Sequence, residues 1–194
     1  MPRQPSLFDA PSALPEGFAY QPDLIDRDEE ARLVEAMGAL GFKPFEFRGY
    51  LGNRRIVSFG WRYDFNDRRL GRAEPLPDWL LPLRDKAAEF AGVRPEAFAH
   101  ALLTEYAPGA GIGWHRDRPE FDVVAGVSLL SPCRFRLRRR TGKRFERLEF
   151  TAEPRSAYRL AGEARDHWEH SIPPLDSLRY SITFRSLRPE AVRR

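Results

Sequence analysis

Arg179-Tyr180-Ser181-Ile182-Thr183-Phe184-Arg185, near the end of the chain, alternates polar and apolar residues. Successive side chains of a β-strand point to opposite faces, so this alternation predicts a strand with one polar face. That face would carry Arg179, Ser181, Thr183 and Arg185. Its two arginines would bring two fixed cations into one cavity, where they could bind a dicarboxylate.

Three residues of metal-ligating type precede this strand, namely His115, Asp117 and His170. On a strand, His115 and Asp117 would point the same way because they are two residues apart. Two histidines and one carboxylate form the facial triad that binds non-haem Fe(II) and leaves positions open for O₂ and a co-substrate. A His-x-Asp pair alone is a weak signal, and both residues could lie in a surface loop. His167 is a rival to His170, although on a strand it would face the other way.

Longer motifs around these residues resemble the AlkB-type Fe(II)/2-oxoglutarate dioxygenases, and the resemblance spans about residues 15 to 188. The motifs are Gln4-Pro5-Ser6-Leu7-Phe8, Leu103-Thr104-Glu105-Tyr106-Ala107-Pro108-Gly109-Ala110, Gly113-Trp114-His115-Arg116-Asp117, Ser128-Leu129, Gly162-Glu163-Ala164-Arg165, Trp168-Glu169-His170-Ser171-Ile172-Pro173 and the final arginine-bearing strand. The resemblance implies an α+β, mainly β fold. This fold is a double-stranded β-helix, or jelly roll, with supporting helices on one sheet and an N-terminal substrate-recognition lid.

The resemblance also implies roles in binding Fe(II), 2-oxoglutarate and O₂. It assigns the iron to a triad of His115, Asp117 and His170. Tyr106 and Arg179 match the residues that bind the distal carboxylate of 2-oxoglutarate, and Arg185 matches a second arginine near its metal-chelating end. Three hydroxyl residues complete the expected co-substrate site: Thr104, Ser181 and Thr183. Thr104 and Ser181 stand where the most familiar members have Asn, so we expect their shorter side chains to reach the co-substrate through water.

The segment Phe59-Gly60-Trp61-Arg62-Tyr63-Asp64-Phe65 resembles the family's nucleotide-recognition lid. Trp61 and Tyr63 could stack on a flipped base, with Arg62 between them in the sequence. The alternative is that Phe59 and Trp61 are core residues of a hairpin.

Other residues could also contact the substrate. Arg54 and Arg55, at the expected turn of that hairpin, are candidate phosphate contacts. Pro119 stands where some DNA-repair members have an acidic residue that contacts the base, and proline cannot make that contact. Glu120 would then have to take it over, or base recognition must differ.

The run Arg134-Phe135-Arg136-Leu137-Arg138-Arg139-Arg140 is strongly basic. On a strand, its even-numbered arginines would share one face, and its Phe and Leu would lie on the core side. Charge runs are usually solvated faces. Four arginines on one face nevertheless repel each other, and a polyanion would relieve that repulsion. Arg134 and Arg136 are therefore candidate nucleic-acid contacts.

The composition fits one compact enzyme domain. The 194 residues are 42% hydrophobic and 12% aromatic, which excludes a disordered chain. The formal charge of +4 and the pI near 9.5 permit a polyanionic partner. We expect a flexible leader at residues 1–14 and a single dioxygenase domain at 15–194. Within it, N-terminal helices and the lid would occupy 15–98, and the jelly-roll core 99–188.

The sequence also indicates where such an enzyme would work. Cys133 is the single cysteine, so it cannot form an internal disulfide, which fits a reducing cytoplasm. The chain has no run of about 18 apolar residues of the kind that spans a membrane. No signal peptide is visible. We expect a cytoplasmic monomer without a membrane partner.

Periodicity and capping residues predict two helices before the strands. The first is expected at 26–40, with Asp26 or Asp28 as its N-terminal cap. The second is expected to begin at an Asp78 cap, to run to about Ala91 and to end at Gly92.

Turn residues and alternation predict the remaining elements. A hairpin is expected at 44–62, with its turn at Gly52-Asn53, followed by a loop from Arg62 to Pro77. Many short strands follow, which indicates a barrel or sandwich. They are expected at 100–106, 112–117, 122–130, 133–140, 145–150, 157–161, 166–171 and 178–186.

The function we expect is oxidative dealkylation of alkylated nucleobases, with DNA alkylation repair as the leading hypothesis. One alternative is the same chemistry on RNA or on a protein side chain. An alternative of another class is a nucleic-acid-binding module that uses the arginine face while its iron site stays idle. A cupin metal protein that does not use 2-oxoglutarate would leave Arg179 and Tyr106 without a purpose.

Overall fold

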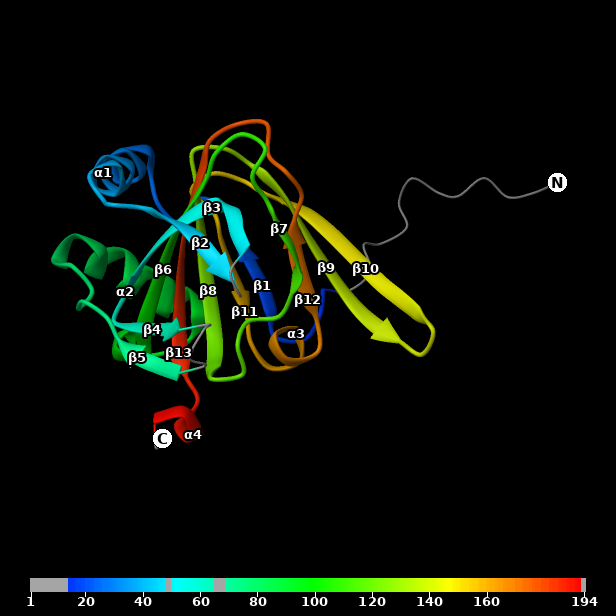
Figure 1. Cartoon of the computed structure of the whole chain (residues 1–194). Coiled ribbons are helices and arrows are strands. Elements are labelled where there is room, and N and C mark those ends of the chain that lie inside the picture. The colour runs from blue at the N-terminus through cyan, green and yellow to red at the C-terminus, as the bar shows by residue number, and fades with distance from the viewer. Residues whose placement is uncertain (1–13, 48–49, 65–68, 193–194) are drawn as a thin grey trace.

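The computed structural model of this protein describes residues 14–47, 50–64 and 69–192, so nearly all of the expected leader lies outside it. In these residues the strands form two antiparallel sheets and a separate two-stranded sheet (Figure 1). The larger sheet contains, in spatial order, β1 (Phe18–Gln21), β11 (Ala157–Leu160), β8 (Phe121–Leu129), β13 (Arg179–Leu187), β6 (Phe98–Tyr106), β3 (Tyr50–Phe59) and β2 (Lys43–Phe47). The smaller sheet contains β10 (Arg144–Ala152), β9 (Cys133–Thr141), β12 (Glu169–Ile172) and β7 (Ile112–His115). The two-stranded sheet pairs β4 (Trp61–Asp64) with β5 (Arg69–Arg72).

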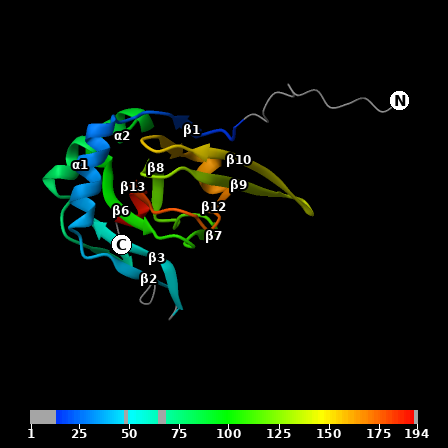
Figure 2. The same cartoon turned by 90° about the horizontal axis from the view of Figure 1, so that it is seen from above.

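Two helices cover one face of the larger sheet. α1 (Arg27–Gly38) and α2 (Leu81–Ala91) lie on the side away from the smaller sheet, so the molecule has three layers (Figure 2). Apolar residues of both helices join the outward side chains of the larger sheet, such as Leu103 and Ile182, in one core. The predicted supporting helices on one sheet are confirmed. The shorter helical turns are η1 (Asp78–Leu80), η2 (Pro95–Ala97), α3 (Gly162–Asp166) and α4 (Pro189–Val192).

The ends of these helices show which capping predictions hold. Asp26 caps α1 in a capping box: Asp26 Oδ1 accepts from the Glu29 amide at 2.8 Å, and Glu29 Oε2 accepts from the Asp26 amide at 3.1 Å. Gly92 ends α2 with a φ of 71°, the left-handed conformation that glycine adopts without strain. The expected Asp78 cap is wrong, because Asp78 begins the η1 turn, whose N-cap is Pro77 and which has no side-chain cap.

β13 confirms the alternation from which its strand was predicted. Tyr180, Ile182 and Phe184 belong to the core beneath the helices. The four residues that alternate with them lie on the opposite, inner face, which the smaller sheet covers, and they are Arg179, Ser181, Thr183 and Arg185. All four are 8% exposed or less, so two arginines are buried between the sheets.

The hairpin before the jelly roll differs from its prediction. β3 runs through Gly52 and Asn53, so the predicted turn is wrong; Phe47 pairs with Tyr50, and the two residues between them lie outside the described residues. β3 pairs with β2 on both sides of these residues, through Leu51 with Glu46 and Arg55 with Pro44, and the strand continues through a sequence that alone favours a turn. The stretch after it is not all loop either, because β4 and β5 pair there.

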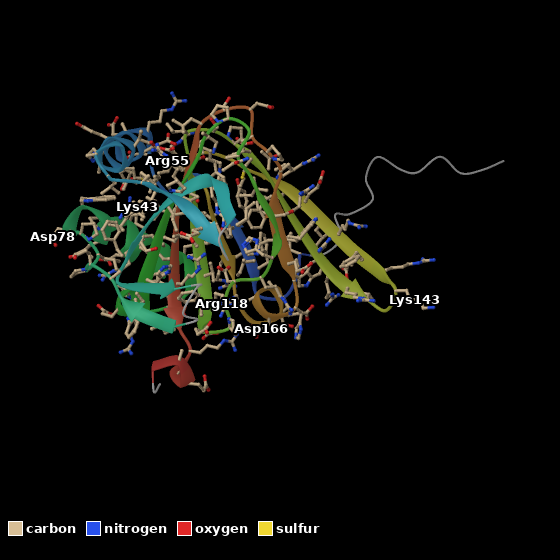
Figure 3. The ribbon with its side chains drawn as sticks, in the orientation of Figure 1. Lys43, Arg55, Asp78, Arg118, Lys143 and Asp166 are labelled. Atoms are coloured by element: carbon tan, nitrogen blue, oxygen red, sulfur yellow. The ribbon has the colours of Figure 1, made fainter. Side chains whose placement is uncertain are left out.

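The later strands match their predicted positions closely, with two differences, and one early strand was not predicted. β7 ends at His115 rather than at residue 117. β12 begins only at Glu169, because α3 occupies residues 162–166. β1, which pairs with β11, was not predicted. The β9–β10 hairpin projects from the sheet, with Lys143 at its tip (Figure 3).

None of the described helices is both long enough and apolar enough to cross a bilayer.

Candidate metal and co-substrate site

The three predicted metal ligands converge at the edge of the smaller sheet. β7 and β12 are neighbours, and their register places His115 opposite His170 with ring centres 4.2 Å apart. Asp117 lies just beyond the end of β7, not on the strand as expected. Its Oδ2 is still 3.9 Å from Nε2 of His170. The structure therefore brings all three side chains together.

The protonation states of these side chains suit a divalent metal. Burial lowers the pKa of His170 to about 3, with a further lowering by His115. Burial also lowers the pKa of His115. Burial alone would raise the pKa of Asp117, but Arg185 and the two imidazoles outweigh it and hold that pKa well below its usual range. At neutral pH the site thus offers two neutral imidazoles and one carboxylate, the forms that bind metals.

The orientation of His115 also suits a metal. Its Nδ1 lies 2.9 Å from the carbonyl oxygen of Gly113. A carbonyl oxygen only accepts hydrogen bonds, so Nδ1 carries the proton and Nε2 keeps a free lone pair. Among the described residues, no three His, Cys, Asp or Glu side chains are arranged so that they could bind a metal ion without moving. The 3.9 Å between Asp117 and His170 is nevertheless shorter than two metal–ligand bonds of about 2.0–2.2 Å laid end to end, so these two donors can reach the same ion.

A buried arginine with unused donors lies farther along the inner face of the larger sheet. Arg179 is 1% exposed and stands opposite Tyr106, with its guanidinium carbon 5.2 Å from the tyrosine ring centre. Its Nη2 donates to Ser128 Oγ at 2.7 Å. Its Nε and Nη1 are buried and have no hydrogen-bond partner in the part of the chain that the structure describes. Unpaired buried donors are costly, and a carboxylate would satisfy these as one charged pair.

Hydroxyl groups line the inner face between Arg179 and Arg185. Ser128, Ser181 and Thr104 form a row across β8, β13 and β6, and each is 5% exposed or less. Thr183 is two residues farther along β13 and is also buried. The structure thus places the three hydroxyl residues predicted for co-substrate binding on the face that carries both arginines.

Two buried residues of this region were not predicted. His100 Nδ1 lies 3.5 Å from Arg185 Nη1, and its ring stacks on Phe121 with centres 5.0 Å apart. His100 and Tyr106 lie an even number of positions apart in the predicted strand, so alternation puts them on the same face. That relationship could have placed His100 in the site. Tyr158 reaches the inner face from β11 through a contact with Gly126 in β8. No local pattern indicates a contact between two strands so far apart in the sequence.

Comparison with known proteins decides the family. The model described as the 2OG-Fe(II) oxygenase superfamily matches residues 24–185. The chain belongs to the 2OG-Fe(II) oxygenase superfamily. Like the superfamily, it uses Fe(II), 2-oxoglutarate and O₂, as predicted. The relatives and the solved structure described below identify it as an AlkB-type dioxygenase.

Two curated relatives are similar over most of this oxygenase. The Arabidopsis thaliana protein named "Alkylated DNA repair protein ALKBH8 homolog" is 26% identical over 211 residues, which cover 94% of this chain and 58% of the relative. The Mus musculus protein named "tRNA (carboxymethyluridine(34)-5-O)-methyltransferase ALKBH8" is 24% identical, covering 89% of this chain and 27% of the relative. The oxygenase therefore spans a little over half of the first relative and about a quarter of the second.

A solved structure confirms the fold of the oxygenase. The structure of OsALKBH1 superposes with a TM-score of 0.69, at 16% identity, over 90% of this chain and 99% of that chain. The two facing antiparallel sheets are thus the double-stranded β-helix that the sequence predicted.

The predicted substrate contacts of the oxygenase lie in several places. Arg54 is not at a turn: it stands opposite Tyr106 on the inner face, with its guanidinium carbon 3.8 Å from the ring centre of Phe45. Arg55, also expected at the turn, points to the other face and forms a bidentate pair with Glu105 at 2.7 and 2.8 Å. Arg54 thus extends the row of Tyr106 and Arg179, and Arg55 is already paired.

The predicted lid is only partly described. Trp61 begins β4 and pairs with Arg72 of β5. The side chains of Arg62 and Tyr63 lie outside the described residues, so stacking on a base by this segment stays a prediction.

A pocket of about 570 Å³ adjoins Asp117. Its charged lining also includes Arg116, Arg118, Arg165, Arg188, Asp166 and Glu169, of which Arg118 and Asp166 are labelled in Figure 3. Arg165 is 4% exposed and donates to the carbonyl oxygens of Arg118 and Phe121, while its Nε has no partner in the described part of the chain. Glu120, the predicted base contact, lies 3.7 Å from Arg118 at the end of the same loop. Four arginines and three carboxylates thus line this space beside the candidate metal ligands, an excess of one positive charge.

The arginine face of β9 is largely compensated within the oxygenase. Arg138 donates to Glu169 at 2.6 Å. Arg136 donates to Ser171 Oγ at 3.0 Å and lies over the ring of Trp114. Arg134 is 3.9 Å from Glu149 and is the more exposed of the two predicted contacts. Carboxylates, a hydroxyl and an aromatic ring thus already contact three of the four arginines, and nucleic-acid contact by Arg134 and Arg136 stays a prediction.

Proposed function

We propose that this dioxygenase removes alkyl groups from alkylated nucleobases by oxidation, with DNA as its substrate, and that it serves DNA alkylation repair. The observation that carries this proposal is the convergence of His115, Asp117 and His170 beside a pocket in which four arginines outnumber three carboxylates. Such a pocket suits a polyanion, because positive side chains bind phosphates largely independently of the base sequence.

The residues divide the work between the two sheets. His115, Asp117 and His170 of the smaller sheet would hold Fe(II), and Arg185 would orient Asp117. Arg179 and Tyr106 of the larger sheet would hold the distal carboxylate of 2-oxoglutarate through the unused guanidinium donors. His170, Arg185, Arg179 and Tyr106 are buried, so these groups would limit the access of bulk water to the reacting alkyl group.

For a methylated base, the proposed reaction would remove the methyl group as formaldehyde. When bound, Fe(II) with 2-oxoglutarate and O₂ supplies an oxidation in which one oxygen atom enters a C–H bond of the methyl group and the other enters succinate, with loss of CO₂. The resulting N–CH₂OH group then breaks its N–C bond and leaves as formaldehyde. The hydroxyl proton returns to the base nitrogen, which restores the base.

RNA is the second candidate substrate. The name of the mouse relative refers to a tRNA, whereas that of the Arabidopsis relative refers to alkylated DNA. Arg54 and the pocket beside Asp117 would bind the phosphates of either nucleic acid. The choice between them therefore depends on contacts to the sugar and base.

The test is formaldehyde and succinate release by the Fe(II)-loaded protein with O₂, 2-oxoglutarate and methylated oligonucleotides. The panel contains DNA and RNA, each single- and double-stranded, with unmethylated strands as controls. Equal amounts of formaldehyde and succinate on methylated DNA support the proposal, and the same result on RNA alone favours the second candidate. Substrate-stimulated succinate without formaldehyde on any strand contradicts nucleic-acid demethylation. Oligonucleotide binding without any succinate favours a binding module instead.

A further inference from the structure

Tyr158 places its ring on the inner face of the larger sheet. It lies on β11, opposite Gly126 of β8, and both residues are buried or largely so. A Cβ at Gly126 would stand 2.3 Å from Cζ and 2.5 Å from Oη of Tyr158, distances that real Cβ atoms do not reach. The end of the ring and its hydroxyl therefore lie directly over the Gly126 backbone, and only glycine leaves room for them there.

A stack of rings fixes Tyr158 in this position. Its ring centre is 4.5 Å from that of Phe135 in the smaller sheet. Phe135 in turn lies parallel to His170, with ring centres 5.5 Å apart and an interplanar angle of 7°. Phe135 therefore lies between the tyrosine and His170 and holds Tyr158 by packing, without any hydrogen bond from the tyrosine hydroxyl in the described part of the chain.

The hydroxyl lies on the inner face between the two buried arginines. Gly126, over which it stands, pairs with Thr183 of β13, and Thr183 lies between Arg179 and Arg185 on that strand. Burial, followed by the charges of Asp117 and Tyr106, raises the pKa of Tyr158 well above its usual range. The group therefore stays protonated at neutral pH and can donate a hydrogen bond, whereas an ionised carboxylate can only accept one.

We propose that the Tyr158 hydroxyl donates a hydrogen bond to bound 2-oxoglutarate, in the room that Gly126 leaves for it. This makes Tyr158 a further co-substrate-binding residue, in addition to those predicted from the sequence. The inference rests on the assignment of Arg179 and the metal triad made in the proposed function. A co-substrate that extends from Arg179 to the triad would pass this hydroxyl, which has no other partner in the described residues.

The competing explanation is that Tyr158 is only a brace for Phe135 and His170. Tyr158→Phe separates the two roles, because it keeps the ring over Gly126 and removes only the hydroxyl. A hydrogen bond to a charged group contributes roughly 1.5–3 kcal/mol, so its loss should weaken 2-oxoglutarate binding about 10- to 100-fold. A brace would leave that affinity unchanged.

The experiment is calorimetric titration of 2-oxoglutarate into Mn(II)-loaded protein, which measures binding without turnover. Tyr158→Phe is compared with the wild type and with Arg179→Gln, and the Mn(II) affinity and the melting temperature of each protein are measured as well. We expect Tyr158→Phe to lose 2-oxoglutarate affinity while its Mn(II) affinity and melting temperature stay at wild-type values. Wild-type affinity in Tyr158→Phe together with a loss in Arg179→Gln overturns this inference and leaves the proposed site standing. Wild-type affinity in both variants overturns the site itself.

A double-mutant cycle provides an independent test. Gly126→Ala forces the ring away from its position, so the hydroxyl should already be lost to the co-substrate. Adding Tyr158→Phe to Gly126→Ala should then weaken 2-oxoglutarate binding no further. Losses of affinity that multiply in the double variant would show that the hydroxyl does not act from its position over Gly126, and would overturn the inference.

Discussion

Arg185 holds Asp117 through one carboxylate oxygen: its Nε and Nη2 lie 2.8 and 2.7 Å from Oδ1. The side chains are 10% and 6% exposed, so the pair is buried. The other oxygen, Oδ2, faces His170 at 3.9 Å. Arg185 thus fixes the carboxylate so that one oxygen is directed at the candidate metal position and the other is already satisfied.

Arg185→Gln should destabilise the metal-free protein by about 3 kcal/mol, because it leaves a buried carboxylate without its cation. Urea unfolding measures the loss. Mn(II) should restore part of it, since a bound cation replaces the missing charge. Arg188→Gln is the matched control: Arg188 also pairs with an aspartate, Asp166, but both side chains are a third exposed or more, so the cost should stay below about 1 kcal/mol. Equal losses in the two variants would contradict the role given to Arg185.

His115→Ala and Asp117→Ala should each reduce succinate formation at least about 100-fold, because each removes one of three metal ligands. Succinate release in the presence of Fe(II), O₂ and 2-oxoglutarate is the measurement. His167→Ala is the control, since His167 is exposed at the end of α3 and should leave the rate within about twofold. Substantial succinate formation by either ligand variant would refute the triad.

Gly126→Ala should destabilise the protein by roughly 1–3 kcal/mol, the usual cost of overpacking. The cause is the clash of the new methyl group with Tyr158. Adding Tyr158→Val removes the obstructing ring end, so the double variant should be more stable than the sum of the single losses implies. Gly38→Ala is the control: nothing lies near its Cβ position in α1, and a helical alanine should stabilise by up to about 1 kcal/mol. Additive losses at Gly126 and Tyr158 would show that the two residues do not meet.

His100 should make the metal-free protein less stable in mild acid. Burial, followed by the charge of Arg185, lowers the pKa of His100 well below its ordinary value of 6.5. Below pH 6.5 the unfolded chain therefore takes up a proton that folded His100 does not. Stability is lost as the pH falls, by up to about 1.4 kcal/mol per pH unit for this one group.

The comparison of urea unfolding at pH 7.5 and pH 5.5 tests this prediction in the wild type and in His100→Gln. The buried histidines His115 and His170 titrate in the same direction, so both proteins should lose stability in acid. The loss of unfolding free energy between the two pH values should be smaller in His100→Gln, because the unfolded variant takes up one proton fewer. Identical losses would mean that His100 is protonated equally in the folded and unfolded chains.

Residues related by strand alternation could be predicted well. The alternation in β13 correctly separated Arg179 and Arg185 from the core side chains between them, because each strand residue's face follows from its number. The same rule put Arg134 and Arg136 on one face of β9. It could not show that Glu149, Ser171 and Trp114 already contact them, since those partners come from other strands.

Features that depend on pairing between distant strands could not be predicted. Gly52-Asn53 favours a turn locally, but β3 pairs with β2 on both sides of it. Pairing of β3 with β6 then places Arg54 on the inner face and Arg55 on the outer one. The contact of Tyr158 with Gly126 is of the same kind. Its existence depends on the register of two strands, which no local sequence pattern specifies.

The division of the candidate site between the two sheets has a consequence for the motions of the molecule. β7, at the edge of the smaller sheet, pairs only with β12 in the described residues, where Ile112 stands opposite Ile172 and His115 opposite His170 across an irregular register. Such a strand should open easily and exchange its amide hydrogens quickly. Iron and 2-oxoglutarate would be bound at the same time by groups of both sheets. Their binding would therefore connect the two sheets and make the opening of β7 less favourable. The β7 amides should then exchange far more slowly in the loaded enzyme than in the free protein, whereas the amides of α1, on the far side of the larger sheet, should hardly change.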